Sequence, residues 1–101
     1  MEYLGSTPEW DPRSLNSSGI HLDDAYLAET VLKDIWMQRA FLRRANLRSA
    51  QLPKANLRET DLSEAKLSDA NLCEAQLRGV ILSKARLHRA RLDDVKFKLA
   101  N

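Results

Sequence analysis

Few side chains in this chain could bind a metal or act as a nucleophile. It has two histidines, His21 and His88, and a single cysteine, Cys73. A zinc site needs His, Cys or carboxylate ligands in a closely spaced set, whereas the two histidines stand far apart with no Cys–His set beside either. One thiol cannot form an internal disulfide. The sequence therefore predicts no metal site and a surface thiol in a reducing compartment.

Motifs that bind phosphates or organise catalysis are also missing. The sequence contains neither G-x-G-x-x-G nor G-x-x-x-x-G-K-[ST]. Serine, aspartate and glutamate are plentiful, but no concave pocket is expected around them to exclude water. No apolar run is long enough to span a membrane, and the N-terminus lacks the pattern of a secretory signal. We therefore expect a non-enzymatic protein without cofactors, located in the cytoplasm.

The sequence feature that must position all the other residues is a repeat with a period of five residues. A Leu, replaced once by Met and once by Phe, stands at every fifth position from Leu22 to Phe97, and a small or β-branched residue stands two positions earlier. On an α-helix, steps of five rotate by about 140°, so these side chains would scatter around the cylinder. In a continuous strand they would point alternately to opposite faces. The pattern fits a chain that turns one corner per repeat and points the small residue and the Leu inward.

Three stretches resemble the A-[DN]-L-x-x consensus of the pentapeptide-repeat family: Ala45-Asn46-Leu47, Ala55-Asn56-Leu57 and Ala70-Asn71-Leu72. The resemblance covers residues 20–101. It implies an all-β fold, a right-handed quadrilateral parallel β-helix of about four coils, in which four repeats make one coil. Successive coils would stack at the interstrand spacing of about 4.8 Å. Such a fold does not by itself name a function.

Residues 1–19 lie outside the repeat and are rich in Pro, Gly and Ser, which favours turns. The segment also carries apolar side chains, among them Tyr3 and Trp10. The end of a β-helix exposes strand edges and core, which must be covered. We therefore expect an N-terminal cap over the first coil. The alternative is a disordered tail.

The sequence stops inside a repeat, at Ala100-Asn101. We expect the last coil to expose Val95, Phe97 and Leu99 together with a free edge, which favours association. An end-to-end homodimer through this coil, a different partner and a truncated chain are the three alternatives.

The first coil, about residues 20–39, departs from the consensus just before its leucines. Where Asn or Asp is usual, it carries Tyr26, Val31 and Trp36, and Phe41 follows at the start of the second coil. Exposed apolar groups of this size usually mark a contact. We expect Tyr26, Trp36 and Phe41 to bind a partner protein, unless the N-terminal cap covers them.

The charges follow the repeat. With four repeats per coil, one predicted column reads Asp24, Arg44, Glu64 and Lys84 and alternates in sign. Exposed ion pairs contribute only about 0.2–1 kcal/mol each, so we interpret the alternation as a device that fixes register.

A second column has no acidic residue and reads Gln38, Arg58, Arg78 and Lys98, a polar side chain followed by three basic ones. Stacked like charges destabilise, so this basic ladder favours binding of an acidic partner surface or a phosphate backbone. A merely solvated ladder, relieved by Glu59, is the alternative.

The sequence thus predicts a rigid rod that docks on a partner protein of unknown identity. The family resemblance implies an alternative, a DNA mimic that binds or inhibits DNA gyrase, but mimicry needs an acidic surface and this chain has a net charge of +2. Weak nucleic-acid binding along the basic ladder is a further alternative, which the acidic coils interrupt.

Overall fold

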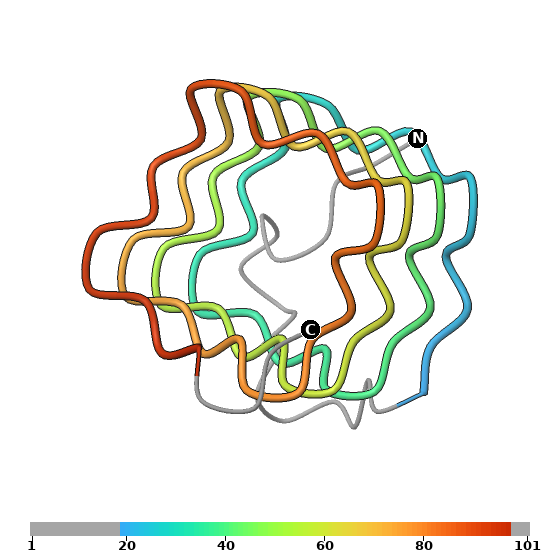
Figure 1. Cartoon of the computed structure of the whole chain (residues 1–101), viewed down its shortest axis with the longest axis horizontal. Helices are drawn as coiled ribbons and strands as arrows, with labels where there is room; N and C mark the ends of the chain where they lie inside the picture. Colours follow the sequence, from blue (N-terminus) through green and yellow to red (C-terminus); the bar gives the residue numbers. More distant parts are fainter. Residues whose placement is uncertain (1–18, 98–101) are drawn as a thin grey trace, which may run out of the picture.

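The computed structural model describes residues 19–97, in which the chain winds as a stack of four-sided coils (Figure 1). Within this range there is no helix and no strand longer than a single bridged residue. Twelve parallel bridges run from His21↔Phe41 to Gln76↔Lys96, and each joins a residue to the one twenty positions later. One coil therefore takes twenty residues, and the coils are 20–39, 40–59, 60–79 and 80–97.

Each coil has four sides, and the sides of successive coils stack into four faces, which we name in chain order. The first face contains residues 20–24, 40–44, 60–64 and 80–84; the second contains 25–29, 45–49, 65–69 and 85–89. The third face contains residues 30–34, 50–54, 70–74 and 90–94; the fourth contains 35–39, 55–59, 75–79 and 95–97. Outward side chains on one face of a coil thus lie beside those of the next coil.

Three backbone N–H groups per repeat hold neighbouring coils together. On the second face, the N–H of Asn46 donates to the Ala25 carbonyl in the preceding coil at 2.9 Å. The N–H groups of Leu47 and Ser49 donate to carbonyls of the following coil, those of Lys66 at 2.7 Å and Ser68 at 2.9 Å. Two of these bonds point toward the C-terminal coil and one points back, and the same pattern recurs in repeat after repeat.

The corner that follows each Leu is a tight turn with a left-handed residue. In the corner after Leu42, the N–H of Ala45 donates to the Leu42 carbonyl at 3.1 Å. The second central residue, Arg44, has a φ of 60°, as a type II turn requires. Non-glycine residues rarely adopt positive φ, yet Asp, Glu, Lys, Arg and Ser do so here. Because the N–H of Arg44 also bonds to the next coil, at 2.9 Å from the Ser63 carbonyl, the ladder holds this conformation.

The core is the predicted pair of inward columns. From Leu27 to Leu77, every residue of the fifth-position column is buried, and so is every small residue from Thr30 to Val80 that stands two positions before it. The apolar side chains at the two ends, such as Leu22 and Leu92, are only partly buried. This confirms that the repeat of five is a corner-turning repeat with an all-β, quadrilateral architecture.

Two threonines take the place of alanine in the core, and both hydroxyls have partners. The Thr30 hydroxyl donates to the Leu27 carbonyl and the Thr60 hydroxyl donates to the Met37 carbonyl, each at 2.7 Å. Among residues 19–97, no buried side-chain nitrogen or oxygen lacks a hydrogen bond.

The expected N-terminal cap, residues 1–19, lies outside the described residues apart from Gly19. Lys98 and Leu99, which were predicted as site residues, also lie outside them. No helix in the described part of the chain is long and apolar enough to cross a membrane.

Candidate interaction surface

The three aromatic residues predicted to bind a partner lie on three different faces. Phe41 is on the first face, half-buried, and stacks on the ring of His21 with centroids 4.7 Å apart. Tyr26 is on the second face and is 69% exposed, and Trp36 is on the fourth face and is 44% exposed. They therefore do not form one patch, and only Trp36 shares a face with the basic ladder.

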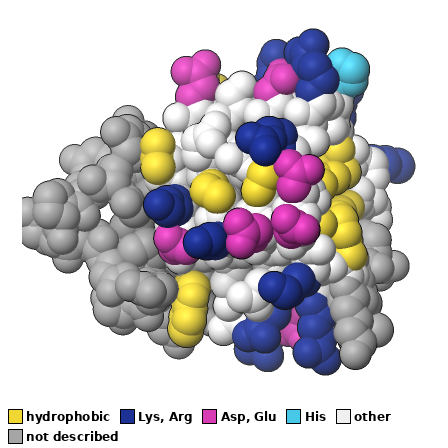
Figure 2. Space-filling model, turned by 90° about the vertical axis from the view of Figure 1, so that its left-hand side faces the viewer, with side chains coloured by type: hydrophobic (Ala, Val, Ile, Leu, Met, Phe, Trp, Pro, Cys, Tyr) yellow, Lys and Arg dark blue, Asp and Glu magenta, His cyan; other side chains and the backbone are white. Residues whose placement is uncertain are grey.

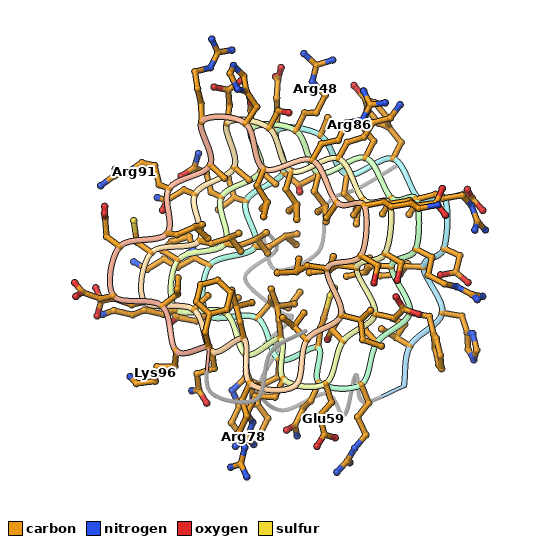
Figure 3. All side chains as sticks on the ribbon, viewed as in Figure 1. Arg48, Glu59, Arg78, Arg86, Arg91 and Lys96 are labelled. Carbon is orange, nitrogen blue, oxygen red and sulfur yellow. The ribbon has the colours of Figure 1, made fainter. Side chains whose placement is uncertain are left out.

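Arg58 and Arg78 of the basic ladder lie on the fourth face, and Arg78 projects from the lower edge in Figure 3. Together with Gln38, Arg39 and Glu59 they line a hollow of about 210 Å³. Lys98, the last residue of the predicted ladder, lies outside the described range.

Hydrogen bonds pair the ladder residues of the first and second coils, whereas the ladder residue of the third coil, Arg78, keeps an uncompensated positive charge within residues 19–97. Nη2 of Arg58 donates to Oε1 of Gln38 at 2.8 Å. Nε of Arg39 donates to Oε1 of Glu59 at 2.8 Å. Glu59 therefore pairs with the preceding coil, and within residues 19–97 the guanidinium of Arg78 has no hydrogen bond or ion pair.

The fourth face as a whole is basic. Its cations are Arg39, Arg58, Arg78 and Lys96 and its one anion is Glu59, so four positive charges less one negative charge give +3 within the described residues. Trp36 lies on this face in the first coil. The arrangement places an exposed indole and a cluster of guanidinium groups on one side of the rod.

The other faces carry charges of both signs. Figure 2, which views the left-hand side of Figure 1, shows basic and acidic side chains interleaved with apolar ones. On the first face, Arg44 pairs with Asp24 at 2.9 Å and Arg43 with Asp23 at 2.7 Å, each across one coil boundary. The side-chain hydrogen bond from each arginine lowers the pKa of its aspartate. In the column that starts at Asp24, the structure shows an ion pair between Asp24 and Arg44, and the register role of the column stays a prediction.

Replacing Asp69 with Asn should flatten the acid side of the stability curve. Nε and Nη2 of Arg89 donate to the two oxygens of Asp69 at 2.8 and 3.1 Å, which lowers the pKa of this carboxyl group from its ordinary value of 3.8. The unfolded chain then binds the proton more tightly, so the stabilisation is complete above the ordinary value and is lost as the pH falls through the folded pKa.

Urea unfolding followed from pH 7 to pH 2 measures this effect. The wild type should lose stability below about pH 4 more steeply than D69N does. Asp34→Asn is the control, because Asp34 makes no side-chain hydrogen bond within the described range. Identical slopes for the wild type and D69N would contradict the assignment.

A second basic cluster lies on the second face and was not among the predicted sites. Arg48, Lys66 and Arg86 line a hollow of about 260 Å³ together with Ser68. Lys66 and Arg86 stand twenty residues apart in one column, whereas Arg48 belongs to a different column. The complete cluster therefore shows in the sequence only when neighbouring columns are compared.

Cys73 is half-buried, and its thiol donates to Oδ2 of Asp93 at 3.6 Å. Within residues 19–97, no group of three or more His, Cys, Asp or Glu side chains could hold a metal ion.

The stacked corners and the two inward columns define a repeat solenoid, the quadrilateral β-helix. The family model for pentapeptide repeats matches residues 25–63 and 60–98, with eight copies. The chain therefore belongs to the pentapeptide-repeat family, which has a repeat scaffold fold.

A solved structure agrees on the fold. The chain is similar to a pentapeptide repeat protein from the thylakoid lumen of Arabidopsis thaliana, with 22% identity and a TM-score of 0.53 over 85% of this chain and 68% of that one. It is also similar to a pentapeptide repeat protein from the cyanobacterium Cyanothece, with 31% identity and a TM-score of 0.47 over 82% of this chain and 60% of that one. No curated protein matches the sequence.

Proposed function

We propose that this protein is a non-enzymatic interaction module, a rigid β-helical rod that docks on a partner protein through its fourth face. The observation that supports the proposal is the presence of exposed Trp36 on the same face as Arg58 and Arg78, where the net charge is +3. Trp and Arg are among the residue types most enriched at positions that dominate binding energy in protein interfaces.

The charge of the face indicates the chemistry of the partner. A guanidinium group donates two parallel hydrogen bonds to a carboxylate, which gives both energy and orientation. The guanidinium of Arg78 has no side-chain partner among residues 19–97, so it is available for such a pair. We therefore expect an acidic protein surface that also offers an apolar contact for the indole of Trp36.

The ladder hydrogen bonds between coils favour docking with little change in backbone conformation. Each of the central coils is held to its neighbours by ladder bonds of 2.7–3.0 Å. A preorganised surface of this kind loses less conformational entropy on binding than a loop does. The partner therefore meets a fixed lattice of side chains.

Charge reversal on the fourth face tests the proposal. Wild-type protein is used to capture its partner, which is identified by mass spectrometry, purified and titrated by calorimetry. Arg58→Glu with Arg78→Glu should weaken the affinity at least about 100-fold, because both side chains would then repel an acidic surface. The matched control reverses Lys33 and Lys54 on the third face and should stay within about twofold.

Trp36→Ala separates a partner contact from a contact within the chain. A partner contact predicts weaker binding with an unchanged free energy of unfolding, whereas an internal contact predicts a lower free energy of unfolding. If neither Trp36→Ala nor the double reversal weakens binding, the fourth face is not the docking surface.

A further inference from the structure

We propose that the second face holds a binding site for a phosphate group, in the hollow between Arg48, Lys66, Ser68 and Arg86. This site lies on a different face from the proposed protein-docking surface and does not depend on it. The hollow measures about 260 Å³, which is enough for a compact oxyanion and its hydrogen-bonding shell.

The fold brings these four side chains together from three coils. Lys66 and Arg86 occupy the same bridged position of neighbouring coils, so their side chains leave the face side by side. Arg48 and Ser68 occupy the next outward column, also one coil apart. Figure 3 shows Arg48 and Arg86 projecting from the same edge of the molecule. The result is a small surface that offers guanidinium, ammonium and hydroxyl donors.

The cluster departs from the ion pairs on its own face and on the first face. There, side chains of neighbouring coils pair opposite charges, as in Asp69–Arg89 and Asp24–Arg44. Lys66 and Arg86 instead stack like charge on like charge, which destabilises the folded chain. Among the described residues, neither makes a side-chain hydrogen bond or ion pair. A bound anion would remove this repulsion.

Carboxylates near the cluster do not neutralise it. Asp69 accepts both its hydrogen bonds from Arg89, and Asp24 is paired with Arg44. Glu64 lies in the adjoining hollow of about 500 Å³, which it shares with Lys66, Lys84 and Arg86 among others. Together the two hollows contain five cationic and two anionic side chains: Arg44, Arg48, Lys66, Lys84 and Arg86 against Asp24 and Glu64.

The surroundings favour a compact dianion over a nucleic-acid strand. Glu64 lines the adjoining hollow with Lys66 and Arg86, and the charge of Arg48 acts on Asp69 on the same face, so further phosphates of a strand would lie near carboxylates. Three cations around one hollow more than balance the charge of about −1.5 to −2 that a phosphate monoester carries near pH 7, and guanidinium groups bind its oxygens in pairs. Free phosphate and the monoester headgroup of a phosphatidic acid share this chemistry.

The test compares the stability of the folded chain in sodium phosphate and in sodium chloride at equal pH and ionic strength. A ligand that binds only the folded chain raises the ratio of folded to unfolded protein by 1 + [L]/Kd. Inorganic phosphate at ten times its Kd should therefore raise that ratio about elevenfold in the wild type. Calorimetric titration with inorganic phosphate supplies the Kd.

Lys66→Gln should abolish the saturable response to phosphate and leave only the general stabilisation that phosphate gives to folded proteins as an excluded salt. In chloride alone K66Q should be at least as stable as the wild type, because the repulsion from Arg86 is gone. Lys54→Gln on the third face is the matched control and should keep the full response. No response in the wild type, or a full response in K66Q, would overturn the proposal.

Two further arms identify the source of the phosphate group. Cosedimentation with vesicles of phosphatidylcholine and phosphatidic acid, competed by inorganic phosphate and lost in K66Q, assigns the site to a lipid headgroup. Calorimetric binding of inorganic phosphate without cosedimentation assigns it to a soluble phosphate. Binding of duplex DNA that is lost in K66Q but insensitive to phosphate would overturn the proposal in favour of nucleic acid.

Discussion

Leu62→Ala is expected to lower the free energy of unfolding by about 2–5 kcal/mol. Leu62 is 1% exposed and stands in the third coil, with coils on both sides. Removing the isobutyl group takes away its burial and leaves a cavity, since ladder hydrogen bonds hold the neighbouring coils and prevent collapse. A solenoid of four coils has a small total stability, so this one substitution should abolish much of it.

Chemical denaturation in urea, followed by far-ultraviolet circular dichroism, measures the effect. Leu92→Ala in the last coil is the control, because Leu92 is only partly buried and its removal leaves no closed cavity. We expect the loss for Leu92→Ala to be less than half of that for Leu62→Ala. Equal losses would mean that the described core is not the one that stabilises the protein in solution.

Ala65→Leu is expected to destabilise the protein by about 1–3 kcal/mol or more, although it adds apolar volume. Ala65 is fully buried on the second face and lies between Ala45 and Ala85 of the adjacent coils. Those coils are only about 4.8 Å away along the stack, and the leucine columns fill the centre of the rod. A larger side chain must therefore push the backbone outward and stretch the ladder bonds beside it.

Ala28→Leu is the matched control, because Ala28 occupies an outward, half-exposed position on the same face. Its free energy of unfolding should stay within about 0.5 kcal/mol of the wild type. Thermal and urea unfolding of both variants make the comparison. If Ala65→Leu proved neutral, the small-residue column would not be the tight contact that the structure describes.

The repeat of five predicts the core because only one arrangement of corners lets every fifth Leu point inward. From that period follow one corner per repeat and the two inward columns, which are consequences of covalent geometry and burial. The coil length of twenty residues, and with it the stacking that brings Asp24 beside Arg44, is implied by the resemblance to the pentapeptide-repeat family. The left-handed residue in each corner is harder to foresee, since its side chain is usually Asp, Glu, Arg or Lys rather than Gly and carries no local signal.

The contacts on the outer surface are harder to predict, because they depend both on the position of a residue within its repeat and on the coil in which it lies. Columns along the stack reveal the ladder of Arg58 and Arg78, while the cluster of Arg48 and Lys66 runs diagonally between columns. The sequence also does not determine in which direction a flexible side chain points. Glu59 could relieve the ladder from within, whereas the structure pairs it with Arg39 in the preceding coil.

The direction of the ladder hydrogen bonds gives the whole rod a polarity. In each repeat two N–H groups point toward the C-terminal coil and one points back, as Leu47 and Ser49 do against Asn46. One peptide dipole per repeat, about 3.5 D, is therefore not cancelled by its neighbours. These dipoles add along the axis, so the coil at 80–97 is the positive pole. The polarity of this rod is therefore opposite to that of an α-helix, whose N-terminus is the positive end. The electric field of the rod favours anions at the C-terminal end of the stack.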